Sequence, residues 1–355
     1  MAQEFWRRRC RKQRSMARGT EEPLLSTGTP ERESKGNARA MVAGPFEMML
    51  LGAALCTVVN TMVGYLHVPL PGLIQGRYFL QWAIVLGLLL LRSRVQNVAF
   101  QPFGPPGQRH WLLLRGVVYY GFIWLWWTTL TLVPVGDAVA VVKCEVFVVG
   151  LLSSALFGER LTWRWCLCCV CAFVGVVLIA RPPFIFGGTD TASVLGRLLN
   201  VVTPLVAGSL PCFIKLAPKA HFLEVQHACD FICGIILSPL VLLATGGSAE
   251  LLQPQAITTV FEVAILGLVA LGSFTLAYQR GEAGRVSLVG YTEVPIAYAS
   301  QVVVFGAAVE PLAVAGAVLV VCSAAAASRE IRRPEPVAAP EDLFSPFPMD
   351  RLPSA

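Results

Sequence analysis

The chain has 355 residues, of which 55% are hydrophobic and 14% are charged, and its formal net charge is +6 at pH 7. Soluble domains carry roughly 25% charged residues, so this composition excludes an ordinary soluble domain and indicates a membrane protein. The positive charge is concentrated in the two tails, where it bears on membrane orientation, and no nucleic-acid partner is expected.

Residues 1–45 are predicted to form a disordered, basic cytosolic tail, because they are polar and too poor in apolar residues to fold alone. The run RRRCRKQR within it is read first as a positive-inside determinant. Contact with anionic lipid, a retention or nuclear-type address and the start of a transit peptide remain alternatives. Residues 328–355, which are rich in proline, are expected to be a second disordered cytosolic tail.

Ten apolar stretches lie between the tails, at residues 46–66, 73–91, 111–133, 138–157, 163–180, 194–216, 222–244, 257–278, 287–306 and 312–327. A helix rises 1.5 Å per residue, so about 20 apolar residues cross the roughly 30 Å hydrocarbon core of a bilayer. The fold class expected is therefore all-α, a polytopic protein with ten transmembrane helices and the lipid bilayer as its surroundings.

The orientation follows from Lys and Arg, which collect in alternate gaps between the stretches. These gaps hold the cluster from Arg7 to Arg39, then Arg92, Arg94, Arg109, Arg160, Arg164, Lys215, Lys219, Arg280, Arg285, Arg329, Arg332 and Arg333. In the opposite gaps, Arg77, Arg181 and Arg197 lie only at helix ends. The positive-inside rule then places both termini in the cytosol. The plasma membrane and the endomembranes of the ER and Golgi remain open as locations.

No disulfide framework is expected, because none of the 11 cysteines falls in an extracytosolic gap. Four of them crowd the stretch 163–180, where they are read as small packing residues, with palmitoylation of Cys166 or Cys10 as the alternative. Neither a metal site nor a cofactor is expected. No nucleophile, metal set or phosphate loop is recognisable, so the chain is not expected to be an enzyme.

An internal repeat is visible when the chain is divided into residues 46–181 and 194–327. The fourth stretch of the first block reads VVKCEVFVVGLLSSALFG, and that of the second reads LVGYTEVPIAYASQVVVFG. Glu145 and Glu293 lie 148 residues apart, the same offset that relates Gly158 to Gly306. Because each block holds five stretches, the second must be inverted relative to the first. Inverted repeats around a midplane site are the architecture of secondary transporters.

Glu145 and Glu293 are the first candidate site residues. An ionisable residue at the centre of a membrane helix costs about 2.5–3.5 kcal/mol on insertion scales, so it usually faces water or a partner. The two stretches enter the bilayer from opposite faces, and both carboxylates are expected near the midplane. They are predicted to bind a coupling proton or cation or a polar substrate. The structural alternative is a pair satisfied by neighbouring hydroxyls or by Lys143.

Lys143 and Arg77 are candidate contacts for an anionic substrate. Lys143 precedes Glu145 by two residues, and on an ideal helix the two side chains point about 200° apart and cannot face one point. Snorkelling toward the membrane surface is the alternative for Lys143, and equally for Arg77 at a helix end.

The seventh stretch begins with Glu224, His227 and Asp230, which share one helix face and are predicted to line a pore. His227 and Asp230 are therefore added to the substrate or coupling candidates, and for His227 a response to a proton gradient is the sharper hypothesis. The third stretch carries an aromatic cluster, read as lipid-facing packing or as a cavity wall for a ring-bearing solute. This cluster comprises Tyr119, Tyr120, Phe122, Trp124, Trp126 and Trp127.

Four runs carry a family resemblance: GPPGQRHWLLLRGV from Gly104, VPVGDA from Val133, LIARPPFIFGG from Leu178 and GEAGRVSL from Gly281. With them the chain resembles EamA-type members of the drug/metabolite transporter superfamily, most closely the G branch of solute carrier family 35. Arg77 and Gln81 also fall where this branch has Arg and Gln. The resemblance implies ten helices in two inverted five-helix EamA repeats, and transport of small metabolites, among which distant branches carry nucleotide sugars.

The function expected is therefore secondary transport of a small organic metabolite by alternating access, with an organic anion or a nucleotide-sugar-like solute among the candidates. The alternative is a membrane protein that does not transport and instead regulates a partner membrane protein. A small-molecule solute is the expected partner, and a homodimer is left open.

Overall fold

The computed structural model describes residues 44–65, 70–133, 135–159, 161–187, 193–245, 254–306 and 308–331. All of them lie within one unit, Ala43–Ala355. The basic run, Cys10 and most of both expected tails fall outside the described residues.

The described residues form helices and no strand. In chain order the helices are α2 (Pro45–Tyr65), α3 (Leu70–Gln96), α4 (Arg109–Leu132), α5 (Val135–Val142), α6 (Glu145–Phe157), α7 (Trp163–Ala180), α8 (Pro183–Phe186), α9 (Val194–Leu216), α10 (Phe222–Phe231), η1 (Ile232–Leu237), α11 (Ser238–Thr245), α12 (Pro254–Arg280), α13 (Ala283–Val289), η3 (Gly290–Thr292), α14 (Glu293–Phe305) and α15 (Pro311–Ile331). The expected all-helical class is confirmed for this part of the chain.

Seven of the ten apolar stretches coincide with one long helix each, namely α2, α3, α4, α7, α9, α12 and α15. The other three are built from consecutive segments: α5 and α6; α10, η1 and α11; and α13, η3 and α14. By length and composition, seven helical segments of the described residues can cross a membrane. This supports an integral multi-pass membrane protein, whereas ten crossings in two inverted blocks stay a prediction.

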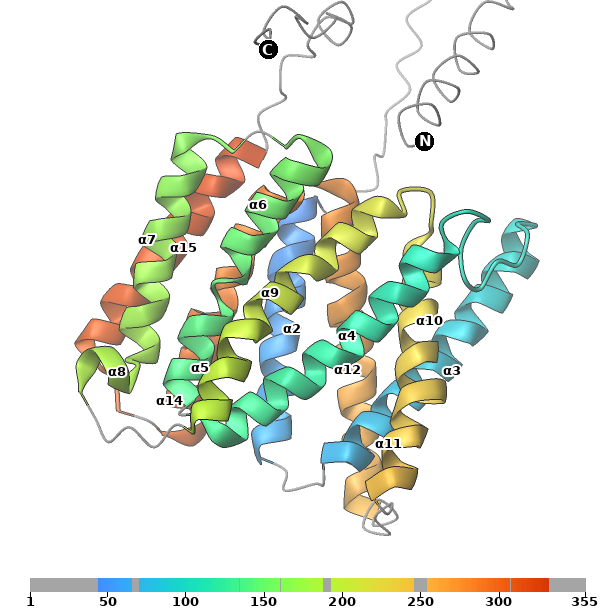
Figure 1. The fold of residues 1–355 in the computed structure, drawn as a ribbon, viewed down its shortest axis with the longest axis horizontal. Helices are drawn as coiled ribbons and strands as arrows, with labels where there is room; N and C mark the ends of the chain where they lie inside the picture. The colour runs from blue at the N-terminus through green and yellow to red at the C-terminus, as the bar shows by residue number, and fades with distance from the viewer. Residues whose placement is uncertain are drawn as a thin grey trace, which may run out of the picture. The chain divides into compact units, whose positions relative to one another are not determined.

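Helices from the two expected blocks pack against each other in pairs. Helix α7 lies beside α15, α2 beside α12, α4 beside α9, and α3 beside α10 (Figure 1). Each pair takes one helix from residues 46–181 and one from residues 194–327. The two blocks are thus interlocked within one unit, and side chains from both contribute to the same interior.

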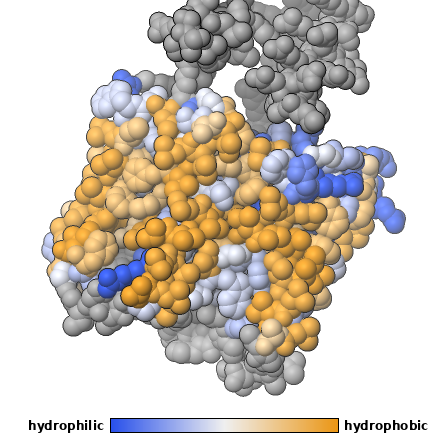
Figure 2. Space-filling model, in the orientation of Figure 1, coloured by the Kyte–Doolittle hydropathy of each residue, from blue (hydrophilic) through white to orange (hydrophobic). Residues whose placement is uncertain are grey.

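The outer face of the helices is apolar. Figure 2 shows hydrophobic side chains spread over the face on which α4 and α9 lie. On α9 the exposed large apolar residues are Val194, Leu195, Leu198, Val201, Val202 and Leu205. A soluble protein rarely exposes an apolar surface of this extent, so this face is suited to contact with lipid tails.

Candidate functional site

The fourth and ninth stretches change their helical winding immediately before a glutamate. In the fourth, the backbone N–H groups of Cys144 and Phe147 donate to the carbonyls three residues earlier, a 3₁₀-like turn between α5 and α6. In the ninth, the 3₁₀ segment η3 separates α13 from α14. Glu145 and Glu293 are the first residues of α6 and α14, each 13 residues long. A short 3₁₀ stretch inside a helix often marks a functional hinge.

The two glutamates meet at Lys143. Lys143 Nζ lies 2.8 Å from Glu293 Oε2 and 3.9 Å from Glu145 Oε1. Asn60, on α2, donates from Nδ2 to Glu293 Oε1 over 3.1 Å. We call Asn60, Lys143, Glu145 and Glu293 the acidic cluster, because its lysine carries one positive charge against two carboxylates.

The acidic cluster is largely enclosed. The side chains of Lys143, Glu293 and Glu145 are 10%, 21% and 29% exposed. Removing charges from water at such depth is costly unless they are paired, and the Lys143 ion pair meets that requirement for Glu293. The expectation that Glu145 and Glu293 share a place is consistent with this geometry, and so is the structural alternative that Lys143 satisfies the pair.

The expectation that Lys143 and Glu145 cannot face one point is wrong. It assumed ideal α-helical winding of 100° per residue, whereas a 3₁₀ turn advances about 120° per residue. The side chains of two residues in a 3₁₀ turn that are two positions apart therefore point about 120° from each other, instead of about 160° by the shorter way round an α-helix. The long lysine side chain spans the remaining distance to Glu145. Lys143 therefore does not snorkel to the membrane surface but lies between two carboxylates.

The polar residues of α10 are all buried but have different partners. Glu224 accepts from Arg92 Nη1 over 3.3 Å and from the backbone N–H of His221 over 3.0 Å, which caps the helix. Burial, and secondarily Arg92, lower the pKa of His221 below its ordinary value. His227 packs its ring 5.2 Å from that of Phe103. Glu224 thus stabilises the helix start, and the predicted pore-lining role of this face stays untested.

Asp230 is fully buried at the end of α10, 0% exposed. Its Oδ1 accepts from Gln226 Nε2 over 2.9 Å, and its Oδ2 has no hydrogen-bond partner among the described residues. The π-helical segment η1 begins two residues later. Such segments are frequent at functional sites because they shift the backbone register of a helix.

Arg77 lies on α3, seven residues after the helix begins at Leu70. Its guanidinium carbon is 5.2 Å from the ring centre of Tyr78, and an added Cβ at Gly267 of α12 would meet Arg77 Nη2 at 2.6 Å. The Nε atom is buried without a hydrogen-bond partner in the described part of the chain. The side chain therefore lies between α3 and α12, rather than projecting freely to a membrane surface.

Of the aromatic cluster on α4, Tyr119 and Tyr120 are buried, 9% and 7% exposed. Phe122, Trp124 and Trp127 are partly buried and pack against the same apolar core, which also includes Tyr78. Interior packing is thus a better description of these side chains than lipid contact.

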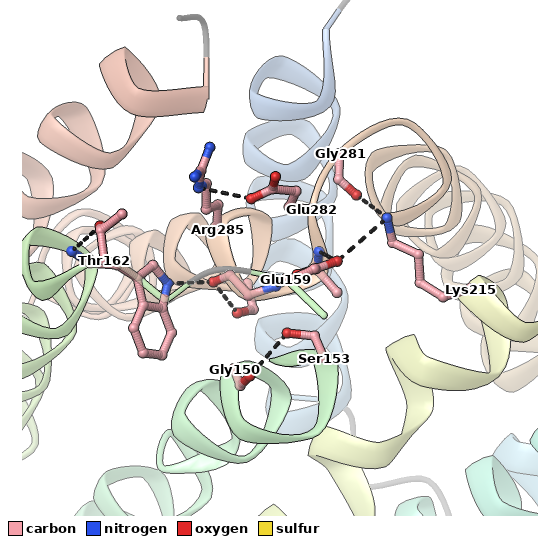
Figure 3. Close-up of polar contacts among 12 residues, drawn as sticks. Gly150, Ser153, Glu159, Thr162, Lys215, Gly281, Glu282 and Arg285 are labelled. Atoms are coloured by element: carbon pink, nitrogen blue, oxygen red, sulfur yellow. Dashed lines mark hydrogen bonds and ion pairs between the residues drawn. The ribbon is translucent and has the colours of Figure 1, made fainter. Parts of the chain in front are cut away.

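A separate polar link joins α6, α9 and α13, and Figure 3 shows it in close-up. Glu159 accepts from the backbone N–H groups of Ala283 and Gly284 over 2.9 and 3.0 Å, at the start of α13. Lys215, at the end of α9, lies with Nζ 3.8 Å from Glu159 Oε1 and donates to the carbonyl of Gly281. We call these contacts the Glu159 link; they join the two expected blocks.

A second link joins the blocks through residues that follow α7 and precede α15. Arg181 Nη1 lies 2.7 Å from Glu310 Oε2, with side chains 43% and 49% exposed. Exposed ion pairs of this kind contribute about 0–1 kcal/mol, so this contact is weaker than the enclosed Glu159 link.

Three polar residues were not singled out from the sequence: Asn60, Glu159 and Arg115. Arg115 is 5% exposed on α4, inside the third apolar stretch. The rule that ionisable residues inside membrane spans mark functional positions applies to Arg115 as it does to Glu145. Asn60 and Glu159 became visible only through contacts with residues more than 100 positions away.

Comparison with known proteins relates the chain to membrane transporters. Residues 46–181 match the EamA-like transporter family. In overall fold the chain is similar to a protein of known crystal structure at a TM-score of 0.66, with 18% sequence identity, over 81% of this chain and 96% of the other. At that identity the likeness concerns the fold alone.

Relatives with similar sequences are named as a transport protein, a solute carrier and an exporter. The probable transport protein YPL264C of Saccharomyces cerevisiae is 28% identical over 61% of this chain and 67% of its own length. Human solute carrier family 35 member G1 is 26% identical over 62% of each chain. The pseudopaline exporter CntI of Pseudomonas aeruginosa is 25% identical over 79% of this chain and 95% of its own. The match covers only about two thirds of the yeast and human proteins. The resemblance to EamA-type drug/metabolite transporters, close to the G branch of solute carrier family 35, is confirmed.

Proposed function

We propose that this protein is a secondary transporter that moves a small organic solute across a membrane by alternating access. The acidic cluster supports this proposal most strongly, because it brings Glu145, Glu293 and Lys143 together. The two apolar stretches that supply these residues both change their helical winding at the glutamate. Buried charge of this kind is costly in a membrane protein and is usually retained for transport or coupling. The relatives named as transport proteins and exporters support the same class.

Two inverted five-helix blocks, residues 46–181 and 194–327, are the architecture we propose for this movement. The equal length of α6 and α14, and the matching positions of their glutamates, support it. So does the pairing of helices across the blocks. In such transporters the blocks rock around a central site, and half-helices interrupted near the midplane form that site.

The roles we assign within the acidic cluster follow from its charges. Glu145 is farther from Lys143 than Glu293 is, so it is the carboxylate freer to accept a proton or bind a cation. Lys143 neutralises Glu293 while the site is closed. Arg77, His227 and Asp230, which lie on α3 and α10, form the part of the path that contacts the solute.

The two links between the blocks serve as gates in this proposal. With both termini in the cytosol, the Glu159 link lies at the cytosolic end and the Arg181–Glu310 pair at the opposite end. The Glu159 link is more enclosed and has more hydrogen bonds. The cytosolic end is accordingly the more firmly closed one in this conformation.

The test is uptake by purified protein in liposomes against a panel of organic anions, nucleotide sugars and amines, with and without a pH gradient. We expect uptake of at least one class above protein-free liposomes, and stimulation by the gradient. Folded, correctly inserted protein that moves none of the panel in either direction would contradict the proposal and favour a regulatory role.

A further inference from the structure

Two of the three guanidinium nitrogens of Arg115 have no hydrogen-bond partner among the described residues. The residue is 5% exposed, and its Nε and Nη1 atoms are buried without a hydrogen-bond partner there. The guanidinium carbon lies 5.7 Å from the ring centre of Tyr119, and the group also contacts the Cys229 side chain. Buried polar groups in native proteins nearly always have a partner, so an ordered water or a bound ligand is required at Arg115.

Arg77, on α3, has one such guanidinium nitrogen. Its buried Nε also has no partner in the described part of the chain, and it lies over the ring of Tyr78. The hydroxyl oxygens of Tyr78 and Tyr119 are 3.3 Å apart, and their rings meet edge to face. Two arginines, each with at least one buried guanidinium nitrogen that has no partner, are therefore each placed against one member of a hydrogen-bonded tyrosine pair.

Asp230 lies near Arg77 and Arg115 but does not neutralise both of their charges. It lies within electrostatic range of both arginines, yet neither forms an ion pair within 4 Å with it among the described residues. One carboxylate against two guanidinium groups leaves a formal charge of +1. Asp230 Oδ2 is free to accept a hydrogen bond.

Close packing holds these residues in place. A Cβ added at Gly234 of η1 would meet backbone atoms of Tyr78 and Phe79 at 2.7 Å, and one added at Gly116 would meet Ile232 at 2.9 Å. Gly116 is the residue next to Arg115. Helices α3 and α4 therefore approach η1 closely on both sides, which limits how far either arginine can move away.

We infer that Arg77 and Arg115 together bind a carboxylate group of the transported solute, while Asp230 accepts a hydrogen bond from a hydroxyl or amino group on the same solute. The inference rests on the proposed function and adds Arg115 and the solute's chemical class to it. A guanidinium fork matches the planar carboxylate in geometry. One negative charge also balances the formal +1 of the three residues, whereas the acidic cluster carries the opposite sign.

The experiment measures binding separately from transport. Thermal unfolding of the purified full chain in detergent is followed with lactate and alanine, and with neutral lactamide and cationic alaninamide as counterparts that lack the carboxylate. We expect at least one carboxylate, and neither amide, to raise the unfolding temperature. Arg115→Gln and Arg77→Gln should each weaken that binding about tenfold to a hundredfold, the usual range for a hydrogen-bonded charged partner. Arg164→Gln, which alters an exposed arginine of α7, should bind as the wild type does.

If Arg115→Gln does not fold, Arg115→Lys decides, because lysine keeps the charge but loses the two-pronged geometry. Weaker carboxylate binding by this variant supports the inference, and unchanged binding overturns it. Transport of solutes that carry no carboxylate, with no carboxylate bound, overturns the inference and leaves the proposed function standing. Carboxylate binding at the arginines without any transport overturns the proposed function and leaves the binding site standing.

Discussion

At the scale of single residues, the buried charges of this protein fall into two groups of opposite sign. The acidic cluster around Lys143 has one more carboxylate than it has cations. The second group, formed by Arg77, Arg115 and Asp230, has one more cation than it has carboxylates. Sequence alone identified Glu145, Glu293 and Lys143 as buried ionisable residues. It did not predict that Lys143 and Glu145 face the same point, because the 3₁₀ turn at Lys143 has no distinctive sequence signal and ideal helical geometry separates the two side chains.

Lys143→Met should destabilise the protein more than the double variant Lys143→Met/Glu293→Gln. Removing one partner of a buried ion pair costs about 3–5 kcal/mol, since the other charge is left unpaired. Neutralising Glu293 as well removes most of that penalty. Thermal unfolding in detergent measures both effects. Lys219→Met, at an exposed position, serves as the control and should match the wild type. Equal losses in the single and double variants would mean that the 2.8 Å pair does not carry this energy.

At the scale of helices, the apolar stretches predicted most of the boundaries, and the internal changes of winding escaped prediction. Helix α9 matches its predicted stretch at both ends, because its mainly apolar sequence begins directly after a serine cap at Ser193. By contrast, η1 interrupts the seventh stretch within a uniformly apolar sequence. Its winding depends on tertiary contacts, such as the hydrogen bond from Gln75 Nε2 to the carbonyl of Gly234 at 2.8 Å.

Gly234→Ala should lower the unfolding temperature, although alanine is the better helix former. The new methyl group meets backbone atoms of α3 at 2.7 Å, and overpacking of this kind costs about 1–3 kcal/mol. Gly121→Ala, on α4 with nothing within 4 Å of the added Cβ, is the matched control. It should be neutral or stabilising by up to about 1 kcal/mol from helix propensity. A Gly234→Ala variant as stable as Gly121→Ala would show that α3 and η1 do not approach so closely.

At the scale of the whole molecule, the repeat explains why distant segments meet. Helices from residues 46–181 pair with helices from residues 194–327, and the acidic cluster, the Glu159 link and the Arg181–Glu310 pair all cross between the blocks. The offset of 148 residues between Glu145 and Glu293 was readable in the sequence. Which helix of one block would lie beside which helix of the other was not, because the apolar pattern carries no information on partners.

The membrane orientation can be tested through the loops. Glycosylation acceptors placed at residues 97–108 should stay unmodified, because the positive-inside rule puts this loop in the cytosol. Acceptors placed at residues 246–250 should receive a glycan. The reverse pattern, read from gel mobility before and after glycosidase treatment, would overturn the orientation and the assignment of the Glu159 link to the cytosolic end.

Gradient-driven uptake by Glu145→Gln and Glu293→Gln, measured beside the wild type in liposomes, tests the central claim most directly. Each change keeps shape and hydrogen bonding but removes the charge that a coupled site needs, so both variants should lose at least about tenfold in rate per folded protein, the effect of roughly 1.4 kcal/mol. Glu262→Gln, at an exposed glutamate of α12, should transport normally. Normal uptake by both cluster variants over a range of pH would contradict the account, because a site that couples transport to a gradient cannot work without these charges.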